Sequence, residues 1–299
     1  MTTTRATSVQ IACEDGIHLS GHLWSTPGPN AGLVIINPAT GVRADYYHRY
    51  AQFLTDHGFS ALTYDYRGIG ASRPASLRGC GYKWRDWGML DFAAALAFAQ
   101  RAAPSTKLLC VGHSIGGYLA GLAPNAASLA RLLTVGAQYA FWPDYAAHKR
   151  LGLVAKWHIA MPALTALCGY FPGKKLGWLE DLPKGVAYEW SFRGALMEHT
   201  HPPHERPEIL HRFSAVTAPI LAITLSDDEF ATLPAIKRTL AYYTGASKSA
   251  VMLHPADFGH EKIGHFGLFH ARHKNDFWPA TLKWLQGGAN PWPHRAVPL

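Results

Sequence analysis

The feature that most constrains the fold of this chain is a regular alternation of apolar runs with helical segments. Residues 33–36 read Leu-Val-Ile-Ile, a run without a polar position, which is typical of a strand covered by helices on both faces. Helices are predicted at 45–57, 86–103 and 115–123, each between two strands. The other strands of this region are predicted at 59–66, 107–111 and 131–138. Such alternation indicates a mostly parallel sheet whose ligand site lies at the carboxyl ends of the strands.

The two ends of the chain extend this pattern. Residues 8–13 and 18–24 are predicted to form two antiparallel strands around the turn Asp15-Gly16. The alternation resumes late in the chain, with strands predicted at 219–225 and 249–254 and helices at 233–244 and 276–286. The tail, residues 289–299, is rich in Pro and is expected to lie on the surface as a strap.

Between these two regular parts the alternation lapses. The stretch from 141 to 213 holds four of the ten tryptophans and seven prolines. We interpret residues 142–213 as a cap that is inserted into a core made of residues 1–141 and 214–299. The functional residues are then expected in the loops that follow the core strands.

Composition excludes several classes of protein. Of the 299 residues, 48% are hydrophobic and only 16% are charged, so the chain can bury a sizeable core and is no candidate for disorder. The formal net charge is +8, but Lys and Arg are scattered, and no nucleic-acid partner is predicted. The four cysteines show neither a CxxC pair nor metal spacing, which predicts reduced thiols and no zinc site.

The apolar stretches bear on where the protein works. The longest, such as residues 92–99, are about eight residues, against roughly 20 needed to span a bilayer. Residues 1–10 lack the apolar core of a secretion signal. The sequence therefore predicts a cytoplasmic protein with no integral membrane segment.

A candidate nucleophile follows the strand at 107–111. Residues 112–117 read GHSIGG, so a GxSxG motif lies between a predicted strand and a predicted helix. A sharp turn of this kind would hold Ser114 in strained backbone angles, and the glycines would leave room for the neighbouring chain. The backbone N–H of Ile115 would then point to where an oxyanion forms. The alternative is a tight turn with a structural role only.

Three further motifs are spread along nearly the whole chain. They are NPATG at 37–41, DYRGIGAS at 65–72 and GHFGLF at 264–269. With GHSIGG, they resemble the α/β-hydrolase superfamily, and in particular a bacterial group of predicted serine hydrolases. The resemblance implies an α/β-hydrolase fold with an eight-stranded, mostly parallel sheet and a helical cap inserted after strand six. It also implies a catalytic triad in the chain order Ser, acid, His.

The triad acid should follow the strand at 219–225. Asp227, Asp228 and Glu229 all lie there, and the stretch aligns best with the superfamily pattern when Asp228 is the acid. Asp227 is the main alternative, and a solvated helix N-terminus is the structural explanation for the remaining acids.

Five histidines lie within twenty residues after the strand at 249–254. Gly264-His265-Phe266-Gly267 resembles the histidine turn of the family, so His265 is the predicted catalytic base and His260 the alternative. His254, which ends the strand, is expected to be structural, and His270 and His273 are expected on a solvated face. Residues 260–265 read HEKIGH, one residue too long for the HExxH zinc motif, and no metal is predicted.

The second oxyanion donor should come from the loop after residues 33–36. Ala39 stands where relatives carry the residue after His-Gly, so the resemblance implies its backbone N–H, with Thr40 next. The two predicted oxyanion and substrate-binding positions are thus Ala39 and Ile115.

These residues predict a carboxylic-ester hydrolase that works on a small acyl substrate without a cofactor. Ser114 would attack the acyl carbon, His265 would act as base and then acid, and Asp228 would orient the histidine. The aromatic-rich cap favours an apolar substrate. The main alternative is an acyltransferase, because NPATG also resembles the LTG turn of homoserine acetyltransferases. A thioesterase, a peptidase and a non-catalytic ligand-binding protein are further alternatives.

Overall fold

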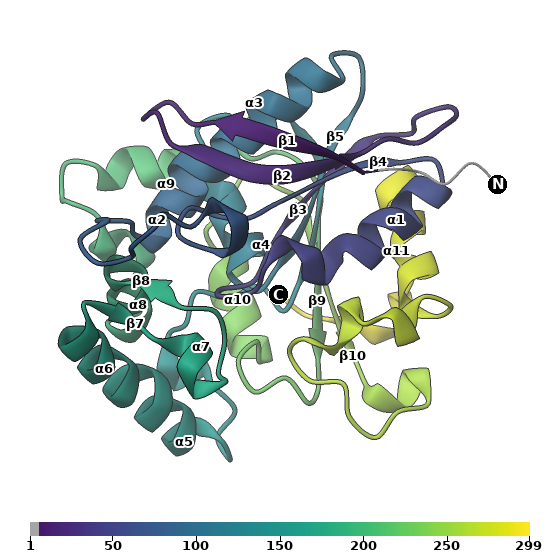
Figure 1. Cartoon of the computed structure of the whole chain (residues 1–299). Helices are drawn as coiled ribbons and strands as arrows, with labels where there is room; N and C mark the ends of the chain where they lie inside the picture. The colour runs from purple at the N-terminus through teal and green to yellow at the C-terminus, as the bar shows by residue number, and fades with distance from the viewer. Residues whose placement is uncertain (1–5) are drawn as a thin grey trace.

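A central sheet organises the chain, and its strands follow the order β1-β2-β4-β3-β5-β6-β9-β10-β11 (Figure 1). The structure is a computed structural model that describes residues 6–299, so part of the segment considered for a secretion signal lies outside the described residues. The strands are β1 (Ala6–Ala12), β2 (His18–Trp24), β3 (Leu33–Asn37), β4 (Ser60–Tyr64), β5 (Leu108–His113), β6 (Leu129–Val135), β9 (Ile220–Leu225), β10 (Lys248–Leu253) and β11 (Ala296–Val297).

The sheet is mostly parallel, as the apolar pattern predicts. All neighbouring pairs from β4 to β10 run parallel, whereas β1, β2 and β11 each join the sheet antiparallel. The resemblance predicts eight strands, and β11 makes a ninth. β11 lies in the tail that the sequence predicts as a surface strap, and its two residues pair with Ala250 and Val251 of β10. The sequence does not predict it, because a strand this short leaves no pattern.

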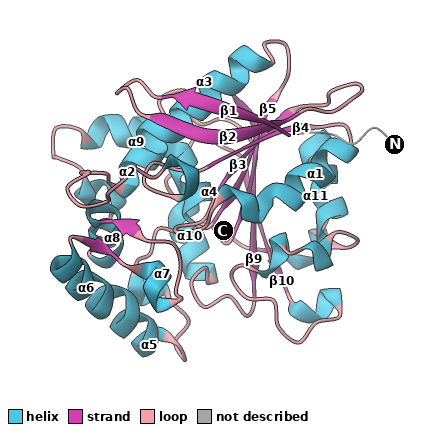
Figure 2. Ribbon diagram, in the orientation of Figure 1, coloured by secondary structure: helices cyan, strands magenta, loops and turns pink. Residues whose placement is uncertain are grey.

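Helices cover both faces of the sheet (Figure 2). One apolar cluster joins α1 and α11 to Val34 and Ile36 of β3, and the other joins α3, α9 and α10 to Leu33 and Ile35. Successive residues of β3 therefore enter opposite layers, which explains why residues 33–36 of this strand are all apolar. The helices of the two layers and of the turn after β5 are α1 (His48–Asp56), α3 (Ala93–Ala102), α4 (Ile115–Leu119), α9 (Arg206–Ala215), α10 (Leu233–Leu240) and α11 (Phe277–Gly287).

A separate group of helices comes between β6 and β9 in the chain and lies to one side of the sheet (Figure 1). One continuous helical run, 150–168, joins α5 (Arg150–Val154) to α6 (Met161–Cys168) through a π-helical stretch, Ala155–Ala160. The short hairpin β7 (Tyr170–Phe171) and β8 (Leu182–Pro183) and the helices α7 (Gly173–Leu176) and α8 (Lys184–Ser191) follow it. α8 packs against α6 and against α2 (Trp84–Asp86), which belongs to the preceding part of the chain.

The run Arg150–Cys168 differs from what the apolar stretches predict. Within the described residues it is the one helix whose length and composition would allow it to cross a membrane. Only 17% of its apolar segment is buried inside the protein. It contains no unbroken apolar stretch of that length, because Lys156 and His158 interrupt the run. The absence of an integral membrane segment stays a prediction.

Candidate active site

Ser114 occupies the sharp turn between β5 and α4. Its backbone has φ 54° and ψ −126°, a region that side-chain-bearing residues rarely adopt, and the residue is 5% exposed. Two glycines make the turn possible. A Cβ on Gly112 would collide with the backbone of Gly117, and a Cβ on Gly116 would collide with the carbonyl of Asn37. The strained turn expected of a GxSxG nucleophile is therefore present.

Gly116 provides a test of how tightly α4 meets β3. We expect Gly116→Ala to lower the free energy of unfolding by about 3 kcal/mol, because the methyl group can fit only if the backbone moves. Gly152→Ala is the matched control: Gly152 is helical and exposed, with nothing within 4 Å of its would-be Cβ, so alanine should be neutral or slightly stabilising. Urea unfolding measures both. Equal stability of the two variants would contradict the close approach.

The structure brings Asp228 and His265 together. Nδ1 of His265 lies 2.7 Å from Oδ2 of Asp228, and both residues are buried. The other carboxylate oxygen accepts hydrogen bonds from the amides of Phe230 and Ala231, at 2.9 and 2.8 Å. Burial alone would raise the pKa of Asp228, but the His265 ring and these two amides outweigh it and hold the pKa below its ordinary value. Asp228 is thus set to stay ionised beside the ring.

Asp227, the alternative acid, does something different. Its Oδ2 accepts hydrogen bonds from the amides of Ile263 and Gly264, at 2.8 and 2.9 Å. Asp227 therefore fastens the loop that ends at His265 and does not touch the ring.

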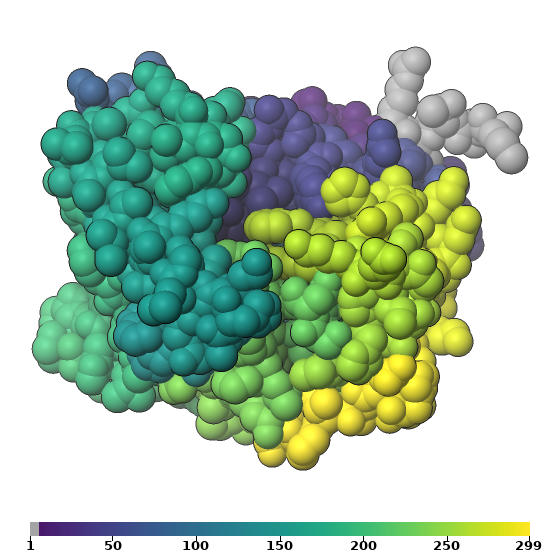
Figure 3. All heavy atoms as spheres, turned by 90° about the horizontal axis from the view of Figure 1, so that it is seen from below, coloured from purple at the N-terminus to yellow at the C-terminus, as the bar shows by residue number. Residues whose placement is uncertain are grey.

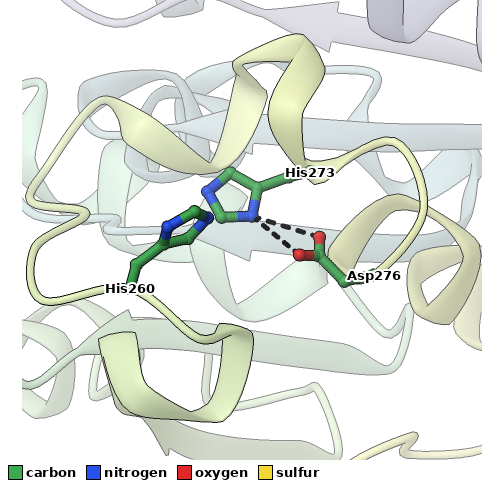
Figure 4. Close-up of side chains that lie close together, drawn as sticks. All are labelled: His260, His273 and Asp276. Carbon is green, nitrogen blue, oxygen red and sulfur yellow. Dashed lines mark hydrogen bonds and ion pairs between the residues drawn. The ribbon is translucent and has the colours of Figure 1, made fainter.

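The histidine loop contains a second His–Asp pair, shown in Figure 4. Nδ1 of His273 lies 3.1 Å from Asp276, and the ring of His260 meets that of His273 edge to face. The three side chains form a group that could hold a metal ion, with potential ligand atoms within 4.8 Å of one another. However, Nε2 of His273 accepts from Arg272, so Nδ1 carries the proton and donates it to Asp276. The prediction that His273 lies on a solvated face is wrong, because the side chain is fully buried.

Ser114 and His265 open into one pocket of about 170 Å³ at the carboxyl end of the sheet. Figure 3 shows the hollow between the teal segment, which includes α5 to α8, and the yellow-green segment that carries His265. The pocket walls are dominated by four tryptophans: Trp84, Trp157, Trp178 and Trp190. Trp157 stacks on Trp190 with ring centroids 4.5 Å apart, and Trp190 stacks on Trp84 at 5.8 Å. Large, mutually packed rings thus give the site a rigid apolar wall.

Two charged residues interrupt this wall. Nζ of Lys156 lies over the rings of Trp157 and Trp178, 4.6 and 4.3 Å from their centroids, and Glu229 also lines the pocket. Burial lowers the pKa of Lys156, and the charge of Glu229 opposes that shift. Trp84 and Lys156 were not singled out by sequence, because neither lies in a motif and only the fold brings them to Ser114.

The first predicted oxyanion donor, Ile115, directly follows Ser114. Ile115 is the first residue of α4, so its N–H has no acceptor within the helix. The positive end of the helix dipole lies at this N-terminus, next to Ser114.

The second predicted donor, Ala39, is wrong in this structure. Its backbone N–H already donates to the hydroxyl of Tyr47, at 3.0 Å in a buried environment. The amide of the next residue, Thr40, has no acceptor within residues 6–299, and Thr40 lines the pocket. Trp84 Nε1 donates to Oγ1 of Thr40 at 3.1 Å, which holds this residue in place. Thr40 therefore replaces Ala39 as the candidate donor.

The hydrogen bond that occupies Ala39 belongs to a longer chain. Tyr47 donates to Nδ1 of His113 at 2.7 Å, and Nε2 of His113 donates to the backbone carbonyl of His265 at 2.9 Å. Because a carbonyl only accepts, this order fixes the tautomer of His113. Burial lowers the pKa of His113 to about 3, so the ring is neutral. His113, the residue before the candidate nucleophile, thus ties β5 to the histidine loop.

The chain has the α/β-hydrolase fold. Residues 28–170 match the family model described as serine aminopeptidase, S33, and this segment contains Ser114 but neither Asp228 nor His265. A search of curated protein sequences gives no match.

Solved structures of the same fold include hydrolases of several kinds. An esterase of Pyrococcus furiosus is 14% identical, with a TM-score of 0.61 over 95% of this chain and 91% of its own. A soluble variant of monoglyceride lipase from Saccharomyces cerevisiae, in complex with a substrate analogue, is 15% identical, with a TM-score of 0.67 over 97% and 96%. A Butyrivibrio proteoclasticus protein with bound ferulic acid is 14% identical, with a TM-score of 0.58 over 92% and 98%. At 14 to 15% identity, these similarities show that the chain shares the fold of these proteins.

Proposed function

We propose that this protein is a serine hydrolase that cleaves carboxylic esters through an acyl-enzyme on Ser114. One observation carries the proposal: a strained serine at a helix N-terminus shares an apolar pocket with a histidine that is paired to a buried carboxylate. A serine hydroxyl is a weak nucleophile at its ordinary pKa and needs such a base. We also propose that the protein belongs to the bacterial group of predicted serine hydrolases that its motifs resemble. We propose that it is cytoplasmic.

In the proposed mechanism His265 takes the proton of Ser114 as the hydroxyl oxygen attacks the acyl carbon. Asp228 holds the ring through Nδ1, which leaves Nε2 free to receive that proton. The amides of Ile115 and Thr40 would stabilise the oxyanion, each worth about 10² to 10³ in rate. His265 then protonates the leaving alcohol, and water, activated by the same ring, releases the acid.

The four tryptophans favour a substrate with an apolar acyl or alcohol group. Two proteins of the same fold are consistent with an apolar substrate, since one is a monoglyceride lipase and the other binds ferulic acid. Residues 142–213, proposed as the cap, supply three of these tryptophans, and Trp84 supplies the fourth from the core.

The proposal is tested by labelling the native protein with a fluorophosphonate probe and locating the label by peptide mass spectrometry. We expect a label on Ser114 and, with a series of p-nitrophenyl esters, faster turnover of medium-chain esters than of the acetate. Unlabelled protein that is stabilised by an ester analogue but turns none over would instead support a ligand-binding protein.

An acyltransferase would also label at Ser114. It is distinguished by adding candidate acceptor alcohols and measuring how the acyl group divides between alcohol and water. A product ratio that follows the acceptor far beyond its share of the solvent would replace hydrolysis by transfer.

A further inference from the structure

The run Arg150–Cys168 has an exposed face that carries no polar side chain. Its most exposed large residues are Leu151 at 87%, Ile159 at 64% and Leu167 at 83%. The other exposed residues of the run are small: Gly152, Ala155, Ala163 and Ala166. Leu151, Ala155, Ile159, Ala163 and Leu167 recur every four residues, so they form one stripe, which we call the apolar stripe. A surface helix of a globular protein normally carries charged or polar residues on its solvent-exposed face.

The opposite face is fixed to the protein. Trp157, Met161 and Thr165 are buried, and the carbonyl of Trp157 accepts a hydrogen bond from Ser191 of α8. Three residues of the run, Leu153, Lys156 and Trp157, line the pocket with Ser114. Enclosing the whole helix in lipid would tear these contacts apart. The run is therefore arranged to lie on a surface, with the stripe outward and the pocket behind it.

The charge around the stripe is one-sided. Residues 145–179 contain five basic residues and no Asp or Glu. Lys149 precedes the run and Arg150 begins it, and the exposed pair Lys174 and Lys175 follows it in α7. Glu180 lies 3.4 Å from Lys174, whereas within the described chain Lys149 and Lys175 have no acidic partner. Basic residues that precede an apolar helical face and follow it in the chain complement an anionic membrane surface.

We propose that the apolar stripe seats this protein on the surface of an anionic phospholipid bilayer. The helix lies in the interface, with Leu151, Ile159 and Leu167 entering the acyl boundary and Lys149 and Lys175 at the headgroups. The pocket, on the other side of this helix, then lies close to the lipid phase, from which an apolar ester could reach Ser114. That last consequence rests on the proposed function, whereas docking itself does not.

The test is co-sedimentation with vesicles of equal parts phosphatidylglycerol and phosphatidylcholine, using full-length protein. The native protein should sediment with these vesicles, less with pure phosphatidylcholine, and less as salt is raised. Ile159→Glu with Leu167→Glu should weaken the partition at least about tenfold. Lys149→Glu with Lys175→Glu should weaken it on anionic vesicles and leave it unchanged on neutral ones.

Leu210→Glu is the matched control, because Leu210 is 39% exposed on α9, away from the stripe. It should bind vesicles as the native protein does. Absence of vesicle binding, or equal loss in Leu210→Glu and the stripe variant, would overturn the proposal. So would light scattering that shows a dimer which the stripe variant converts to monomer, since a second copy would then cover this face.

The binding assay needs no turnover, so its outcome is independent of the chemistry. If ester hydrolysis is absent but the stripe variants lose vesicle binding, docking stands and the proposed function fails. If hydrolysis of a soluble short-chain ester is the same in native protein and stripe variant while both bind vesicles equally, the proposed function stands and docking fails.

Discussion

Ser114→Ala and His265→Ala should each reduce the hydrolysis of a reactive ester by roughly 10⁵ to 10⁶-fold. The hydroxyl provides the attacking atom and the ring removes its proton, so neither works without the other. For the same reason the double variant should be about as slow as either single variant. The measurement is kcat/KM with a p-nitrophenyl ester, after thermal unfolding has shown that each variant is folded.

The second His–Asp pair of the histidine loop supplies the control. His273 pairs with Asp276 as His265 pairs with Asp228, but His273 is not among the residues that line the pocket. His273→Ala should therefore keep most of the ester activity, although the loss of a fully buried ring should lower stability. If His273→Ala were as inactive as His265→Ala while remaining folded, the assignment of the base would be wrong.

Asp228→Asn should reduce kcat by about 10⁴-fold with little change in KM. The amide cannot accept the Nδ1 proton as the carboxylate does and stabilises no positive charge on the ring, so His265 loses its orientation and its basicity. Oδ1 would still accept from the Phe230 and Ala231 amides if the side-chain amide is oriented accordingly, so the turn should survive.

Asp227→Asn is the neighbouring control for this variant. Asp227 binds two backbone amides of the histidine loop and leaves the ring alone, so we expect a loss of less than about tenfold in kcat, with reduced thermal stability. A larger effect on kcat in Asp227→Asn than in Asp228→Asn would reverse the two roles.

Much of the fold follows from the sequence pattern, because buried parallel strands are predominantly apolar and their helices must alternate with them. β3, β4, β5, β6, β9 and β10 all lie within a few residues of their predicted bounds. β11 could not be found in this way, since two residues carry no periodicity. The exposed face of the run 150–168 could not be predicted, because burial depends on what packs against the helix. A stripe of Leu, Ile and Ala has the same sequence pattern whether it faces lipid, protein or water.

The site divides along similar lines. Ser114 and Ile115 follow from a local motif with its strand and helix, and the pairing of Asp228 with His265 agrees with the order of motifs in the family. The NPATG turn points to Ala39, but this motif carries no information about Tyr47, eight residues later, whose hydroxyl accepts from the Ala39 amide. Trp84 and Lys156 reach the pocket from segments far apart in the chain, and only the tertiary structure brings them together.

The hydrogen-bond chain from Ala39 through Tyr47 and His113 to His265 has a consequence for how this sequence can diverge. Every member is buried, and each donates in one direction, so losing one side chain strands a donor on one side and an acceptor on the other. A substitution of Tyr47 alone is therefore costly, whereas a coordinated exchange of Tyr47 and His113 for another pair that accepts from Ala39 and donates to the His265 carbonyl need not be. Positions 47 and 113 should consequently covary across descendants of this gene, even though 66 residues separate them.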